Sequence, residues 1–150
     1  MRKWFLVAVL LWLFLMAGWA VKSRQPSVLT SATLAGKKLQ IEIAKTAAER
    51  EKGLSDRRFL CPDCGMLFLF ETPGYYGFWM KRMYFDIDII WIRGDKVVDI
   101  TRQARKPEAT EFEAPKTIYS PREAVDKVLE VNAGWCEKNS VKIGDKIIIN

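Results

Sequence analysis

The stretch from residue 65 to residue 92 constrains the fold more than any other part of the chain, because it combines dense aromatic residues with repeated apolar runs. The runs cover 66–70, 78–80 and 87–92, and a Thr-Pro-Gly sequence at 72–74 separates the first two. Short apolar runs bounded by turn residues are typical of buried strands. We therefore predict consecutive strands of one buried sheet, with a turn at 72–74.

Strand and helix signals continue on both sides of this stretch. Leu39, Ile41 and Ile43 alternate with polar residues, and the AGK sequence at 35–37 predicts a hairpin with 28–34. The remaining signals predict a hairpin of 87–92 with 96–100, a loop over 102–117, a strand over 125–131, a helical turn at 134–139 and a strand pair within 141–149.

One short helix is predicted over 47–52. Thr46 and Glu49 have the spacing of a capping box, in which each side chain accepts a hydrogen bond from a free backbone N–H group of the first turn. Gly53 stands where a glycine commonly ends a helix.

Many short strands with one or two short helices predict a mainly β domain at the margin of the α+β class. We expect a single compact sandwich or partly closed barrel of mostly antiparallel strands, with sequential meander pairing in the middle of the chain. The predicted organisation is a membrane anchor or signal peptide at 1–21, a linker at 22–30 and the β domain at 31–150.

The N-terminal segment predicts the cellular localisation of the protein. Residues 4–21 contain no charged side chain and are long enough to span a bilayer, so we expect a single-pass anchor in the cell membrane with the C-terminal domain outside the cytoplasm. The small residues Gly18 and Ala20 offer the competing interpretation, a cleaved signal peptide and a secreted domain.

Charge and composition exclude several classes of function. The formal charge is +6, but acidic residues are interspersed among the basic ones, so we expect no nucleic-acid partner. The excess of positive charge suits an anionic membrane surface instead. The chain contains no histidine, which excludes histidine-based catalytic triads and histidine metal ligands.

Cys61 and Cys64 form a C-x-x-C sequence that is compatible with a disulfide, a redox pair or half of a metal site. Because the pair precedes a strand and not a helix, we predict a structural disulfide that is dispensable for folding. Cys136 is expected to be a buried small apolar residue. Three methionines near the pair, Met66, Met80 and Met83, are either copper ligands or fillers of an aromatic core; we expect no metal and no cofactor.

Six blocks of the sequence resemble the signature of uncharacterised protein family 0127, also called domain of unknown function 192 (DUF192). They are 53–57 (GLSDR), 65–70 (GMLFLF), 78–81 (FWMK), 87–92 (IDIIWI), 128–134 (VLEVNAG) and 143–146 (IGDK). The resemblance spans about residues 38 to 150 and implies a compact, mainly β domain without an assigned activity. Ser55, Arg82 and Asp86 depart from the family's usual Met, Asn and Pro.

Four charged residues lie within apolar surroundings: Lys81, Asp86, Asp88 and Glu130. The resemblance covers the positions of Lys81 and Asp88, and we predict that the two share a cleft or an ion-pair network beside Trp79 and Met80. The alternatives are an ion pair that sets strand register and a shallow binding site. In the second case Trp79 supplies a stacking face, and Lys81 or Arg57 supplies a charge.

These observations favour a membrane-tethered extracytoplasmic binding or accessory module for a small polar ligand, a glycan or an envelope protein. A thiol redox or copper-handling protein that uses Cys61 and Cys64 is the first alternative. An enzyme is the second, and it is less favoured because the sequence contains no nucleophile–base pair, no recognisable pair of catalytic carboxylates and no glycine-rich phosphate loop.

Overall fold

The computed structural model describes residues 29–150, so the predicted anchor or signal segment lies outside the described residues. The elements are β1 (Leu29–Leu34), β2 (Lys37–Ala44), α2 (Ala47–Lys52), β3 (Cys64–Gly74), β4 (Phe78–Trp79), β5 (Ile87–Arg93), β6 (Lys96–Ala104), the 3-10 turn η1 (Ala109–Glu111), β7 (Ile118–Tyr119), β8 (Val125–Asn132), α3 (Trp135–Lys138) and β9 (Ile147–Ile149). Within this part of the chain, no helix is long and apolar enough to span a membrane.

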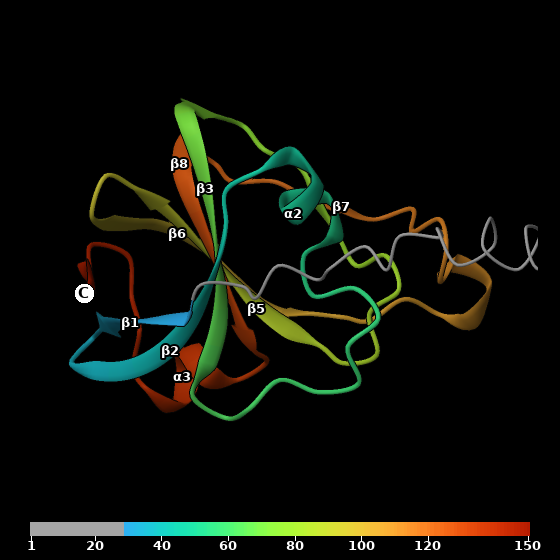
Figure 1. Ribbon diagram of the computed structural model, residues 1–150, viewed down its shortest axis with the longest axis horizontal. Coiled ribbons are helices and arrows are strands. Elements are labelled where there is room, and N and C mark those ends of the chain that lie inside the picture. The colour runs from blue at the N-terminus through green and yellow to red at the C-terminus, as the bar shows by residue number, and fades with distance from the viewer. Residues whose placement is uncertain (1–28) are drawn as a thin grey trace, which may run out of the picture.

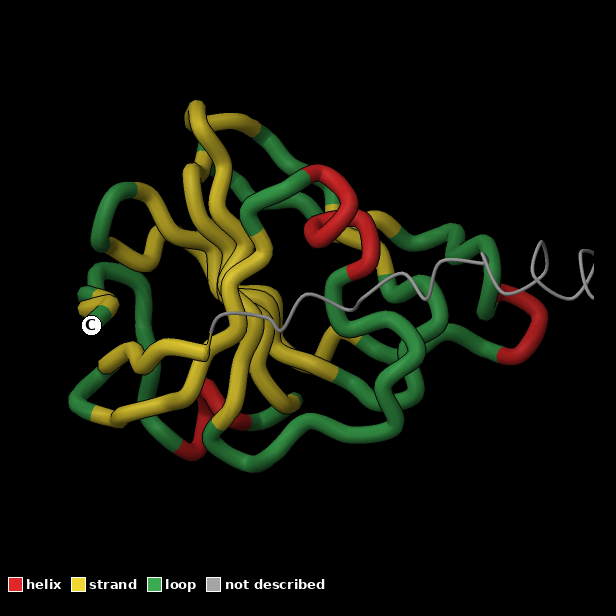
Figure 2. The backbone as a smooth tube through the Cα atoms, viewed as in Figure 1, coloured by secondary structure: helices red, strands yellow, loops and turns green. Residues whose placement is uncertain are grey.

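The main sheet has seven strands in the order β6-β5-β8-β3-β2-β1-β9, and only β2 and β3 run parallel. The strands twist strongly, as Figure 1 shows, and the helices lie at the periphery of the sheet in Figure 2. The two ends of the sheet meet where Val97 N donates to Asp145 O at 2.9 Å and Lys96 forms a bridge with Lys146. The prediction of a mainly β, partly closed barrel is therefore confirmed.

The locally encoded elements form as predicted. β1 and β2 form the first hairpin, and β5 and β6 form another. The helix α2 begins after the capping box: Glu49 N donates to Thr46 Oγ1 at 3.2 Å, and Thr46 N donates to Glu49 Oε2 at 2.8 Å. Gly53 follows the helix with a φ of 47°, a left-handed angle that favours glycine.

The predicted meander in the middle of the chain is wrong. β8 lies between β3 and β5, and β4 leaves the main sheet to pair with β7 in a separate two-stranded sheet. The physical reason is burial: β8 carries buried Val128 and Leu129 on opposite faces. As a central strand, β8 pairs with β3 along one edge and with β5 along the other, and its two faces contribute to the two apolar cores.

Two further local predictions are wrong. The Thr-Pro-Gly sequence does not form a turn, because β3 continues to Gly74, which pairs with Val125 beyond an irregularity that follows Leu69. Proline is tolerated where the ladder is interrupted in this way. The predicted strand pair within 141–149 also does not form; only β9 is a strand, and it pairs with β1.

The curled sheet separates two apolar cores. Even-numbered residues of β5, such as Ile90 and Ile92, face the interior of the barrel, and the odd-numbered Ile87, Ile89 and Trp91 face the outer core. The outer core is covered by partly buried side chains from the segments that follow α2 and surround β4, including Leu60 and Phe78. A pocket opens within this outer layer.

Candidate functional site

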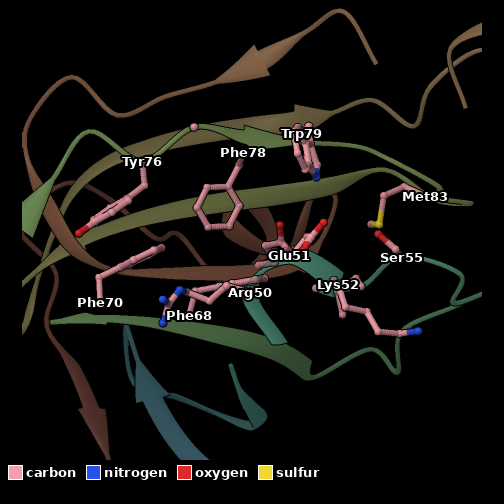
Figure 3. A pocket seen from close by; sticks show the side chains of 14 residues that line it. Arg50, Glu51, Lys52, Ser55, Phe68, Phe70, Tyr76, Phe78, Trp79 and Met83 are labelled. Atoms are coloured by element: carbon pink, nitrogen blue, oxygen red, sulfur yellow. The ribbon is translucent and has the colours of Figure 1, made fainter. Parts of the chain in front are cut away.

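The candidate site is a pocket of about 150 Å³ between α2, the segment around β4 and the outer face of the sheet. Tyr76, Phe78 and Trp79 line one wall, and the facing wall carries Phe68 and Phe70 together with side chains of α2 (Figure 3). Ser55 and Met83 lie together at one end (Figure 3). The lining therefore combines five aromatic side chains with a few charged and polar groups, a combination found in small-molecule sites.

The rings of this pocket pack in defined geometries. Phe78 meets Phe68 edge to face at a centroid distance of 4.9 Å and meets Trp91 at 5.5 Å. Phe70 stacks on Tyr76 at 3.6 Å. The guanidinium carbon of Arg50 lies 5.1 Å from the Phe70 ring centroid, and Arg50 Nη1 also donates to Leu69 O at 3.0 Å. Contacts on several sides hold these walls in place.

Glu130 places a carboxyl group in the pocket wall from β8. Strand register aligns it with Met66 on β3 and Ile89 on β5, so both of its sheet neighbours are apolar. Glu130 is only 5 % exposed, and its Oε2 atom has no hydrogen-bond partner among the described residues. Burial away from water raises its pKa to about 8, and the charge of Arg57 opposes this rise.

Arg57 does not neutralise Glu130 by direct contact, because its guanidinium is bound elsewhere. Arg57 donates from Nη2 to Glu42 Oε2 at 2.8 Å and from Nη1 to Glu42 Oε1, a paired arrangement that raises the pKa of Arg57. Hydrogen bonding to Glu42 is the main cause of that rise. The Glu130 carboxyl thus lines the pocket while Arg57, the cation whose charge opposes the rise of its pKa, is engaged with another carboxylate.

The model of the family DUF192, described as an uncharacterized ACR, matches residues 29–149. The chain belongs to the DUF192 family. The resemblance found in the sequence blocks is confirmed, and the family description assigns no activity to the pocket.

Two solved structures have a fold similar to that of this chain. One is a protein of Sinorhizobium meliloti 1021 described as a putative transcription regulator; it is 30% identical, has a TM-score of 0.74, and the match covers 82% of this chain and 95% of that one. The other is a protein of unknown function from Novosphingobium aromaticivorans DSM 12444, with 29% identity, a TM-score of 0.72 and coverage of 86% and 91%. No curated protein matches the chain.

Within the DUF192 domain, the predicted site residues do not form one cluster. Trp79 lines the pocket and is 46% exposed, whereas Met80 is buried in the outer core. Lys81 is not a lining residue, and its carbonyl accepts a hydrogen bond from Ser55 Oγ at 2.8 Å. Arg57 binds Glu42, as described above.

The predicted network of Lys81 with Asp88 is not found. Asp88 is fully buried on the barrel side of β5, where Oδ1 accepts from Gln103 N and Oδ2 accepts from Cys136 N, both at 2.9 Å. No salt bridge joins Lys81 to Asp88 among the residues that the structure describes. Two backbone amides satisfy the carboxylate, so no lysine is needed to bury it.

Glu130 stands out in the sequence as a charge among apolar residues, but the sequence does not place it in a site. The signal was its position within the apolar run VLEV at 128–131, where a glutamate occupies a buried face of β8. Two of the aromatic residues that surround the pocket, Phe70 and Phe78, belong to apolar runs that were predicted to form buried strands. Their common orientation toward one cavity depends on the departure of β4 from the main sheet.

The cysteines lie away from this pocket. Cys61 and Cys64 form the predicted disulfide, which joins the loop before β3 to the first residue of that strand. Asn132 Nδ2 donates to Cys61 O at 2.8 Å. Cys136 is buried as expected, and burial raises the pKa of its thiol well above the usual range. In the described part of the chain, no group of three or more acidic or cysteine side chains is arranged to hold a metal ion.

Proposed function

We propose that the DUF192 domain of this protein is a binding module that holds a small ligand in the pocket beneath α2, with Glu130 as its polar anchor. The observation that carries the proposal is the buried Glu130 carboxyl, whose Oε2 has no partner among the described residues. A buried polar atom without a partner costs about 1–3 kcal/mol. Such atoms are few in native proteins, and a ligand that completes the hydrogen bonding accounts for this one.

The size and lining of the pocket limit the ligand. A cavity of about 150 Å³ has the volume that holds a benzene-sized group. The occupant is therefore a small molecule, or one side chain or terminal group of a larger one. Trp79 is half-exposed at the pocket, so its indole is available to stack on the part of a larger ligand that stays outside.

We also propose that the module is tethered to the outer side of the cell membrane by residues 4–21. The uncharged segment supports this address, and so does the Cys61–Cys64 disulfide, because disulfides persist in oxidising compartments. A C-terminal alkaline phosphatase fusion should be active in cells. Activity of a cytoplasmic reporter at the same position would show that the proposed orientation is wrong. A mature N-terminus near residue 21 would show that the segment is cleaved and the domain is secreted.

Binding is tested by NMR on the full chain in nonionic micelles, with labelled methionine methyl groups. Met83 lines the pocket, whereas Met80 is buried in the same core but is not a lining residue and serves as the internal control. The probes are n-butanol, butyrate and n-butylammonium. A probe of five heavy atoms that gains about 0.8 kcal/mol per atom has a Kd of about 1 mM.

We expect at least one probe to shift the Met83 methyl resonance in a saturable manner with a smaller effect on Met80. The proposal fails if none of the three probes shifts Met83 at concentrations well above that Kd.

A further inference from the structure

We infer that the pocket selects an organic cation, namely a protonated amine on a short aliphatic stem, with the Glu130 carboxylate as counter-ion and the aromatic rings around the stem. The inference rests on the proposed function and names the chemical class of its ligand. It follows from three features of the pocket. These are the missing hydrogen-bond donor at Glu130, the aromatic lining and the partners that the nearby basic side chains already have.

The first feature is the direction of hydrogen bonding that Glu130 requires. An ionised carboxylate only accepts hydrogen bonds, and Oε2 receives none from the described residues. Its sheet neighbours Met66 and Ile89 have no donor to offer from their side chains. An ammonium group carries three hydrogen-bond donors and a positive charge, so it supplies the carboxylate with both a donor and a counter-ion.

The second feature is the aromatic lining. A cation within about 6 Å of a ring centroid is attracted to the negative face of the ring. This pocket already shows the effect with a cation of its own, because the Arg50 guanidinium carbon lies 5.1 Å from the Phe70 centroid. Phe78 and Trp79 add further aromatic surface to the same cavity. A neutral ligand would leave this attraction unused, and an anion would be repelled by both the rings and Glu130.

The third feature is that the basic groups near the pocket have partners of their own. Arg57 is bound by Glu42 on β2, and the Arg50 guanidinium donates to Leu69 O. Lys52 Nζ lies 3.9 Å from Asp56 Oδ2. The remaining charged lining residue, Glu51 of α2, is acidic. Among the lining residues, the carboxylates of Glu51 and Glu130 can therefore pair with an incoming cation, and of the two only Glu130 is buried.

Binding of an ammonium group displaces a proton from Glu130. With a pKa of about 8 in the absence of ligand, the Glu130 carboxyl is mostly protonated at pH 6. In the binding step, the protonated carboxyl and the ammonium ion form a carboxylate–ammonium pair, and one proton is released to solvent. Affinity should therefore rise about tenfold per pH unit from pH 6 toward pH 8. It should level off above pH 8 until the amine itself loses its proton near pH 10 or above.

The test compares three probes of nearly equal size and different charge on the full chain in nonionic micelles, read from the Met83 methyl resonance. At pH 8 we expect n-butylammonium to bind at least about tenfold more tightly than n-butanol, and butyrate to bind least. Glu130→Gln should lose about tenfold or more of the n-butylammonium affinity and keep that of n-butanol. Glu137→Gln, which removes an exposed glutamate outside the pocket, should change neither.

The outcomes separate this inference from the proposed function. If n-butanol or butyrate binds as tightly as n-butylammonium at pH 8, the pocket binds ligands but does not select cations. If none of the probes binds, the proposed function fails as well. Because the comparison of the three probes uses the unmodified protein, it decides the matter even if Glu130→Gln perturbs folding.

Discussion

Replacing Glu130 with glutamine should stabilise the domain at neutral pH, by an amount that grows with pH. Glutamine has nearly the same shape but no charge at any pH. In the native state the Glu130 carboxyl has a pKa of about 8, compared with 4.5 for the ordinary value, because burial disfavours its ionised form. Between these two values the unfolded chain releases the proton and the native protein retains it. Ionisation then favours the unfolded state of the wild-type protein alone.

The sign and size follow from linkage. The native state binds more protons than the unfolded state between about pH 4.5 and pH 8, so the free energy of unfolding of the wild type falls as pH rises through this window. Each pH unit is worth about 1.4 kcal/mol, so the wild type should lose about 3 kcal/mol by pH 7 relative to Glu130→Gln. Below pH 4.5 the two proteins should be nearly equally stable, and above pH 8 their difference should be constant.

Urea denaturation of the full chain in nonionic micelles, followed by near-ultraviolet circular dichroism from pH 5 to pH 9, measures this difference. Buffers without amines are required, since an amine that occupies the pocket would pair with Glu130. Glu137→Gln is the matched control and should follow the wild-type curve, because this glutamate is exposed on α3. Parallel curves for Glu130→Gln and the wild type across the window would refute the reasoning, since they would mean that Glu130 is ionised and well paired in the native state.

Two other predictions concern residues outside the pocket. Asp88→Ala should lower the free energy of unfolding by about 3 kcal/mol or more, because two backbone amides lose a charged acceptor. Lys81→Ala should lower it by less than about 1 kcal/mol. Similar urea midpoints for both variants would instead support an ion pair between Lys81 and Asp88. The double change Cys61→Ser, Cys64→Ser should lower the free energy of unfolding by about 2 kcal/mol or less, because the disulfide closes a very short loop. Unchanged methionine methyl spectra should accompany that loss, and global unfolding would show that the bond is essential.

The elements that the sequence predicted well depend on interactions between residues close together in the chain. The side chains of Thr46 and Glu49 each accept a hydrogen bond from the other residue's backbone N–H within one helical turn, so a short local sequence specifies where α2 begins. The hairpin of β1 and β2 likewise follows from alternation on both sides of a two-residue turn at Ala35 and Gly36, which have φ angles of 49° and 74°. Six spaced blocks were enough to identify the family, because they preserve the order of these elements.

The sequence alone therefore determined the class of fold, the short helix and the hairpins, and it singled out Asp88 and Glu130 as charges among apolar residues. Only the tertiary structure decided that β8 lies between β3 and β5, that Asp88 meets the amides of Gln103 and Cys136, and that Glu130 lies in an aromatic pocket. Apolar patterning shows which face of a strand is buried, but many strand orders bury the same faces. The choice among them, and with it the partner of each buried charge, depends on packing between residues far apart in the chain.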